Sequence, residues 1–362
     1  MQRMRAIDLF CGTGGFSRGA HAAEFDVVAA YDIDPNLTYS YPLNFPGTKV
    51  RLTDVAQLTG DAIRKDVGKQ HIDLIFGGPP CQGFSAIGRR DRDDPRRTLL
   101  EHFFRIVSEV RPSAFVMENV EGLLFSDAVQ ELERATVHAA GYQLLETRVL
   151  NAADFGAATN RRRAFVIGYD ADLCAPFDWT AFEDAKKPAA TVRDAISELK
   201  APVPMGEDSE GFDVWRLRKR NDRSTYSEER MSIDGRFTGN KRTSHTPNVV
   251  KRFSELKQGG FDPIGKYPRL AWSGLCPTLR AGTGADKGSH QAIRPIHPDE
   301  DRVITVREAA RLQGFPDEHR FHPTIWHSFR QIGNSVSPII AEAILTVLRE
   351  KLEEGPLAQA AE

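Results

Sequence analysis

The chain has 362 residues, is 40% hydrophobic and carries a formal net charge of −2 at pH 7. This length suggests two domains or one large one, with ample apolar residues for a core. A nearly neutral net charge says nothing about a nucleic-acid partner. The four cysteines are scattered and form no CxxC pair, which disfavours both a zinc site and a disulfide framework.

The sequence lacks the features of a membrane or secreted protein. No apolar run approaches the roughly 18 residues of a membrane span. The first residues reach Asp8 without the apolar core of a signal peptide. We therefore expect a cytoplasmic protein in a reducing compartment, with no membrane contact and no metal.

The N-terminal segment predicts a βαβ unit. Residues 5–10 are expected to form a strand, residues 11–16 a glycine loop, residues 17–24 a helix, and residues 26–31 a second strand that ends at Asp32. An acidic residue about 20 positions after such glycines is the arrangement that holds ribose hydroxyls. Position 17 is Ser, where a dinucleotide fingerprint has its third glycine. This argues against NAD and leaves room for S-adenosylmethionine, although a lone glycine loop is equally compatible with a tight turn.

The next predicted strand, residues 71–76, leads into Gly77-Gly78-Pro79-Pro80-Cys81. Glycines allow a tight turn and prolines stiffen it, so Cys81 is expected on a rigid mount. The charged segment 89–97 that follows looks mobile. A thiol on such a mount beside a mobile loop suits a covalent nucleophile with a lid. A free cysteine is more often a buried apolar residue, but these flanking residues are too specialised for packing alone.

A helix over residues 98–110 and a strand over 113–118, ending in Glu118 and Asn119, continue this alternation. The glycine loop, Asp32, Cys81 and Glu118 each follow the carboxyl end of a successive predicted strand. In a doubly wound sheet those ends share one crevice, where ligands bind. Glu118 alone would be read as a solvated strand end, but its place in this series favours a functional role.

The second half of the chain changes character. Residues 143–151 and 162–169 are expected to form two more strands, with an arginine cluster before the second. Residues 210–252 hold 11 Lys/Arg against 6 Asp/Glu, interleaved with Trp215, Tyr226 and Phe237. Such a stretch suits contact with phosphates and base edges, or equally a solvated surface. Residues 305–316 predict a helix with N-cap Thr305 and a capping box, and residues 338–348 an apolar helix.

These motifs, in order, resemble those of the DNA (cytosine-5)-methyltransferases over nearly the whole chain. The matching segments are the glycine loop, Pro79-Pro80-Cys81, Glu118-Asn119-Val120, Arg161 and Arg163, Pro277-Thr278, and Gly333-Asn334 with Val336. The chain departs at Thr159, where the family has Gln, and at Ala158, where it has Pro. The resemblance implies an α/β, Rossmann-like doubly wound sheet with an inserted smaller target-recognition domain. The catalytic domain would be residues 1–190 plus 326–362, and the recognition domain residues 191–325.

By this resemblance Cys81 attacks C6 of a flipped-out cytosine, Glu118 donates to N3, and Arg163 stabilises O2. Asn119 and Arg161 would fix the surroundings, and residues 85–97 would close over the base. The resemblance assigns S-adenosylmethionine to Phe10, Gly12, Gly14, Gly15, Asp32, Ile33, Asp54, Pro79, Asn334 and Val336. From the sequence alone, Asp54 could equally be a helix N-cap.

The implied substrate is double-stranded DNA, with a cognate restriction endonuclease as a further partner and a monomer as the default. Two alternatives stay open: a tRNA cytosine-5 methyltransferase, and an inactive relative that binds S-adenosylmethionine or DNA. A methyltransferase acting on exocyclic amino groups is disfavoured, because it needs an aromatic residue where Cys81 follows Pro80.

Overall fold

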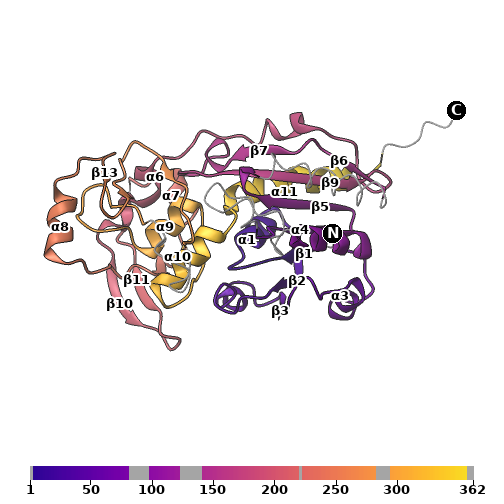
Figure 1. Cartoon of the computed structure of the whole chain (residues 1–362), viewed down its shortest axis with the longest axis horizontal. Helices are drawn as coiled ribbons and strands as arrows, with labels where there is room; N and C mark the ends of the chain where they lie inside the picture. The colour runs from indigo at the N-terminus through magenta and orange to yellow at the C-terminus, as the bar shows by residue number, and fades with distance from the viewer. Residues whose placement is uncertain (1–2, 81–97, 123–140, 220–221, 283–293, 357–362) are drawn as a thin grey trace.

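The computed structural model describes residues 3–80, 98–122, 141–219, 222–282 and 294–356. An eight-stranded sheet forms the centre of the larger lobe, in the order β3-β2-β1-β4-β5-β9-β6, with β7 also paired to β9 (Figure 1). The first five strands of this order are parallel, and β9 runs antiparallel to β5. The strands are β1 (Arg5–Leu9), β2 (Asp26–Asp32), β3 (Lys49–Leu52), β4 (Leu74–Gly77), β5 (Ala114–Asn119), β6 (Tyr142–Leu144), β7 (Arg148–Asn151) and β9 (Arg162–Asp170).

Helices cover both faces of this sheet, which explains why its central strands are apolar throughout. One core packs Phe16 of α1 and Ile344 of α11 against Phe76 and Val116. The other packs α3 and α4 against the opposite side chains of the same strands. The helices of the larger lobe are α1 (Gly15–Ala22), α2 (Tyr41–Asn44), α3 (Gly60–Val67), α4 (Thr98–Val110) and α11 (Pro338–Glu354). This arrangement confirms the predicted doubly wound fold class.

The smaller lobe lies between β9 and α11 in the chain and holds a three-stranded antiparallel sheet, β10-β11-β12 (Figure 1). Its helices are α6 (Val192–Ile196), α7 (Thr225–Glu228), α8 (Pro247–Ser254), α9 (Val306–Gln313) and α10 (Ile325–Asn334). Its strands are β10 (Val203–Glu207), β11 (Asp213–Arg216), β12 (Arg236–Thr238), β13 (Phe261–Asp262) and β14 (Tyr267–Pro268), and β15 (Cys276–Pro277) pairs with β8 (Thr159–Asn160). By packing, α10 belongs with α9 in the smaller lobe and α11 with α1 in the larger one. The division at residues 190 and 326, which stays a proposal, instead counts α10 with the larger lobe.

Ile325–Glu354, taken as one helical stretch, is long and apolar enough to cross a membrane. However, 72% of its most apolar window is buried inside the protein. Within it, α10 packs on α9 and α11 on α1, as core helices of a globular protein do.

Candidate active site

The glycine loop turns sharply at the carboxyl end of β1. Phe10, Gly12 and Gly14 all have positive φ, at 61°, 48° and 85°. The Gly12 amide donates to Asp32 Oδ2 and the Asp34 amide to Oδ1, each at 2.9 Å. Burial raises the pKa of Asp32, which is only 7% exposed, whereas these backbone donors oppose that rise. Asp32 therefore braces the loop, and each carboxylate oxygen keeps a lone pair for another donor.

The residues around this loop fit an adenosyl group. Apart from the neighbours of Gly12 in the chain, no described residue has an atom within 4 Å of the place where a side chain would begin at Gly12. The Ile33 side chain, next to Asp32, is 66% exposed, which is unusual for a large apolar residue. Asn334 is exposed at the end of α10. An exposed apolar side chain, a carboxylate and an open glycine suit an adenine, a ribose and a close backbone approach.

The remaining predicted cofactor residues have packing roles as well. Any side chain at Gly15 would collide with Ser335 and the Val336 carbonyl, so this glycine lets the returning segment close on the loop. Pro79 and Val336 are buried. Asp54 Oδ1 accepts a hydrogen bond from the Ala56 amide at 2.9 Å, which fixes a turn rather than a helix.

Glu118 and Arg163 form a largely buried ion pair. Glu118 is the last residue but one of β5, and Arg163 is the second residue of β9. Arg163 Nε lies 2.9 Å from Glu118 Oε1. Among the residues that the structure describes, Oε1 has no well-directed hydrogen-bond donor. A side chain at Gly78 would begin 3.3 Å from Glu118 Oε2, so the turn leading toward Cys81 passes beside this carboxylate. Cys81 and the predicted lid, residues 85–97, lie outside the described residues.

Asn119 fixes that same turn. Its side-chain amide donates to the Pro79 carbonyl at 3.0 Å, and its Oδ1 accepts from the Val120 amide at 2.8 Å. The side chain is buried, so both bonds are shielded from water. Asn119 thus ties the end of β5 to the backbone two residues before Cys81.

Arg161 has contacts different from those of Arg163. It is 3% exposed and donates to the carbonyl oxygens of Leu279 at 3.3 Å and Gly333 at 3.2 Å. Burial and the nearby Arg163 lower the pKa of Arg161 to about 9, and Glu118 partly opposes this. These bonds join the larger lobe to the chain after β15 and to the end of α10. They support a positioning role.

Thr159, where the chain departs from the family motif, is fully buried between the lobes. β8 pairs in parallel with β15, and the Thr159 hydroxyl donates to the Cys276 carbonyl at 3.1 Å. In the opposite direction, the Thr278 hydroxyl donates to the Asn160 carbonyl at 2.6 Å. The threonine at position 159 therefore makes a hydrogen bond that links β8 to β15.

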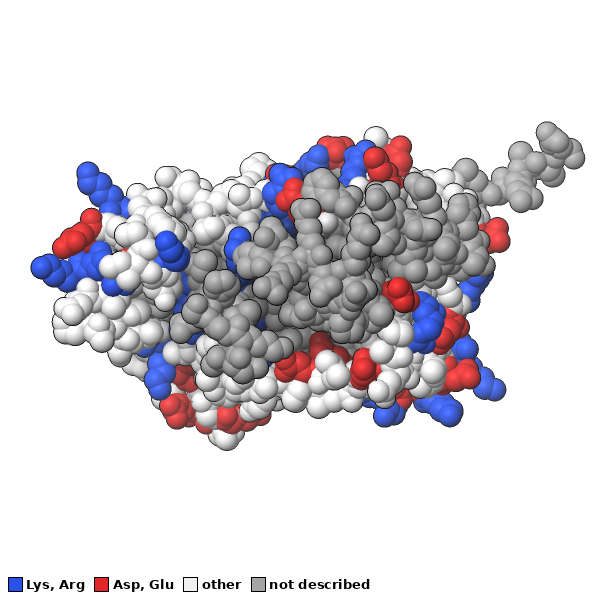
Figure 2. Space-filling model, viewed as in Figure 1, with Lys and Arg blue, Asp and Glu red and all other residues white. Residues whose placement is uncertain are grey.

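The basic stretch 210–252 is less available for DNA than its composition suggests. Several of its arginines pair with acidic residues, including Arg223 with Glu198, Arg242 with Glu300 and Arg252 with Asp262. Figure 2 shows Lys and Arg interleaved with Asp and Glu on the face in view. Tyr226 and Phe237 are buried in the core, so neither ring is exposed to contact base edges.

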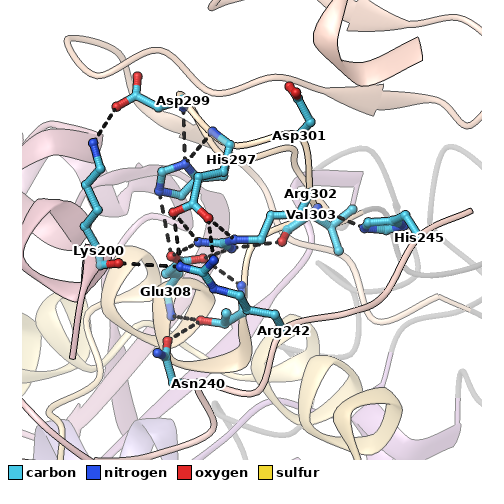
Figure 3. A network of polar contacts seen from close by, with 12 residues as sticks. Lys200, Asn240, Arg242, His245, His297, Asp299, Asp301, Arg302, Val303 and Glu308 are labelled. Atoms are coloured by element: carbon cyan, nitrogen blue, oxygen red, sulfur yellow. Dashed lines mark hydrogen bonds and ion pairs between the residues drawn. The ribbon is translucent and has the colours of Figure 1, made fainter. Parts of the chain in front are cut away.

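The sequence did not predict a polar network that surrounds the buried Glu308 in the smaller lobe (Figure 3). Glu308 of α9 accepts two 2.8 Å hydrogen bonds from Arg302, which also contacts Glu300. His297 Nδ1 accepts from the Asp299 and Glu300 amides, and burial lowers the pKa of His297. The capping box of Thr305 and Glu308 was the only sequence signal for this network, and it is confirmed. No metal-binding group of three His, Cys, Asp or Glu occurs in the described part of the chain.

Comparisons with known proteins agree on one family. The model of the family described as C-5 cytosine-specific DNA methylase matches residues 4–350. The type II methyltransferase M.XorII of Xanthomonas oryzae pv. oryzae is 40% identical over 98% of this chain and 87% of its own length. M.AgeI of Thalassovita gelatinovora is 30% identical over 96% of this chain and 99% of its own length.

Two solved structures resemble this one. A putative DNA modification methyltransferase encoded within an E. coli prophage has a TM-score of 0.83 and 36% identity, covering 97% of this chain and 99% of that chain. The S. pombe Dnmt2 methyltransferase has a TM-score of 0.66 and 19% identity over 97% of this chain and 99% of that chain, a likeness of fold alone.

Proposed function

Because the chain belongs to the C-5 cytosine-specific DNA methylase family, we propose that Cys81, Glu118 and Arg163 are the groups with which it methylates cytosine in DNA. The protein is a DNA (cytosine-5)-methyltransferase with type II relatives, and its family implies S-adenosylmethionine as methyl donor. The observation that carries the residue assignment is the buried Glu118–Arg163 pair beside the turn that leads to Cys81.

The chemistry needs these three groups. Carbon 5 of cytosine is a poor nucleophile, and a thiolate bond from Cys81 to C6 makes C5 enamine-like. This addition moves negative charge onto N3 and O2. Glu118 would hydrogen-bond N3 through a shared proton, while Arg163 would donate to O2, so the pair would exchange its mutual contact for the base. S-adenosylmethionine supplies the methyl group. A base then takes the C5 proton, the C5–C6 double bond re-forms, and the electrons of the C6–S bond leave with Cys81 as its thiolate.

The duplex substrate requires one further step. C6 of a stacked cytosine is out of reach, so the target base must be flipped from the helix. We propose that Asn119 holds the Cys81 turn in place for that base. Arg161 would keep the two lobes at a fixed separation around it. The type II relatives support a cognate restriction endonuclease as a partner. We keep a cytoplasmic monomer as the working expectation.

The test is methyl transfer from radiolabelled S-adenosylmethionine to mixed-sequence duplex DNA, with tRNA in parallel and bisulfite sequencing of the DNA. We expect label on cytosines in one short sequence context. Cys81→Ala should abolish transfer while S-adenosylmethionine binding, measured by calorimetry, persists. Near-normal turnover by Cys81→Ala would overturn the mechanism. Label on tRNA alone would contradict the DNA substrate, and no label on either would indicate an inactive relative.

A further inference from the structure

Two arginines at the junction of the lobes have no acidic partner among the residues that the structure describes. Arg280 is exposed, and Arg294 is partly buried. The guanidinium of Arg294 stands 4.7 Å from the centre of the Phe329 ring. Most other arginines of the smaller lobe are neutralised by a carboxylate, as Arg302 and Arg311 are. No carboxylate of the described residues therefore compensates the positive charge of Arg280 or Arg294.

Arg280 follows β15, the strand that pairs with β8 just before Arg161 and Arg163 in the chain. β15 and β8 run in parallel, with Pro277 opposite Asn160, and three residues beyond these partners lie Arg280 and Arg163. Arg161 maintains the contact beyond the ladder through its bond to the Leu279 carbonyl. The backbone of Arg280 and Ala281 also packs so closely on Gly333 that any side chain there would collide with it. Thus the backbone at Arg280 is held by two separate contacts.

The Arg294 side chain packs on α10 one helical turn before the point that Arg280 contacts. Its partner Phe329 and the Arg280 contact Gly333 are four residues apart on α10, so they occupy one face of that helix. One turn rises about 5.4 Å. Phosphates of one DNA strand follow one another at about 3.4 Å along the duplex axis. The two contact points on α10 are thus spaced on the scale of one or two phosphate steps.

We propose that Arg280 and Arg294 form a phosphate clamp, which grips the sugar–phosphate backbone of the target strand next to the flipped cytosine. This inference rests on the proposed catalytic pocket, because Arg163 defines where that cytosine would sit. Each guanidinium offers several donors in a planar fork that matches phosphate oxygens. The clamp would carry no base preference, since phosphate contacts fix register without reading sequence. It would hold the strand while its base leaves the stack.

The experiment measures binding of a fluorescein-labelled duplex by anisotropy at increasing salt, in the Cys81→Ala background so that turnover plays no part. Arg280→Gln and Arg294→Gln should each make the slope of log K against log salt shallower by about 0.9, and together by about 1.8. Arg294→Lys should retain the slope because it retains the charge. The control is Lys65→Gln with Lys69→Gln, which removes two exposed charges at α3 and the loop after it and should leave the slope unchanged.

Calorimetry measures the affinity of each arginine variant for S-adenosylmethionine. It shows whether the variant still folds and whether the substitution disturbs the cofactor pocket. We expect unchanged cofactor affinity in both arginine variants. Unchanged slopes would overturn the clamp. So would a loss of cofactor affinity with unchanged slopes, since the arginines would then serve the methyl donor. A failure of the proposed catalytic assignment appears elsewhere, as turnover by Cys81→Ala, and is not confused with either result.

Discussion

Two buried carboxyl groups lie beneath the glycine loop. Asp8 of β1 accepts a 2.6 Å hydrogen bond from the Ser17 hydroxyl, which also contacts the Tyr41 hydroxyl at 2.6 Å. Burial raises the pKa of Asp8 well above its usual range, and the neighbouring Asp32 adds to the rise. The folded protein therefore holds a proton on Asp8 at pH values where the unfolded chain has lost it.

This raised pKa predicts a pH dependence of stability. Since the folded state binds the extra proton, the Asp8 contribution to stability is present below the unfolded pKa and is lost as pH rises toward the folded one. Asp8→Asn should therefore gain stability relative to the native protein between about pH 5 and 8. Urea unfolding at pH of about 5 and about 8 measures how the difference in stability between the variant and the native protein changes. Asp61→Asn, at an exposed acid, is the control, and a constant difference at both pH values would contradict the prediction.

Asp32 predicts a cofactor effect. Asp32→Ala removes the acceptor of the Gly12 amide as well as the proposed ribose partner. We expect binding of S-adenosylmethionine to weaken by about 1–3 kcal/mol, the cost of stranding a polar group. Calorimetry gives the affinity directly, and an unchanged value would remove Asp32 from the pocket.

Residue roles that follow from local motifs were predictable from the sequence, whereas roles set by distant partners were not. The placing of Asp32 and Glu118 at strand ends follows from the βαβ alternation. By contrast, the partners of Arg161 and Thr159 lie more than 100 residues away in the chain. No local pattern indicates that Thr159 joins two lobes. The sequence showed only that position 159 departs from the family motif.

Secondary-structure elements show the same limit. The strands with continuous apolar runs and the helix α4 were predicted at nearly their observed bounds. β3 was missed because it is a four-residue edge strand with mostly exposed side chains. The predicted strand 143–151 is two strands, because the pairing with β9 shifts by one residue between Leu144–Gly168 and Arg148–Phe165. A shift of this kind depends on the partner strand and leaves no mark in the sequence.

The cap of α9 gives a prediction at this scale. The Thr305 hydroxyl accepts from the Glu308 amide, and Glu308 accepts from the Thr305 amide at 2.7 Å. Thr305→Ala should lower the free energy of unfolding by about 1–2 kcal/mol. The matched control is Thr246→Ala at α8, whose N-cap side chain makes no capping bond. Equal losses in urea unfolding would count against the capping role.

For the whole molecule, charge pairing decides how strongly salt affects DNA binding. Lys241 and Arg242 are adjacent and exposed. Arg242 pairs with Glu300 at 2.9 Å, whereas Lys241 has no acidic partner in the described part of the chain. The Asp213 carboxylate fixes the backbone here by accepting from the Lys241 amide. The sequence count of cations therefore overstates the charge that DNA can meet.

This difference is testable by salt titration of DNA affinity. Lys241→Gln should reduce the slope by about 0.9 if Lys241 meets a phosphate, whereas Arg242→Gln should change it less, because its charge is already balanced. Equal changes in both variants would show that the ion pair does not matter for binding.

The parallel pairing of β15 with β8 also bears on how new target specificity could be engineered. Residues 276–280 are tied to the catalytic lobe by that ladder and by Arg161, whereas β10 to β14 contribute no strand to the central sheet. A graft between relatives should then take residues 203–268 as a cassette and leave 269–280 native. A crossover placed after Pro277 would separate Arg161 from its acceptor and yield a chimera whose two halves no longer fit.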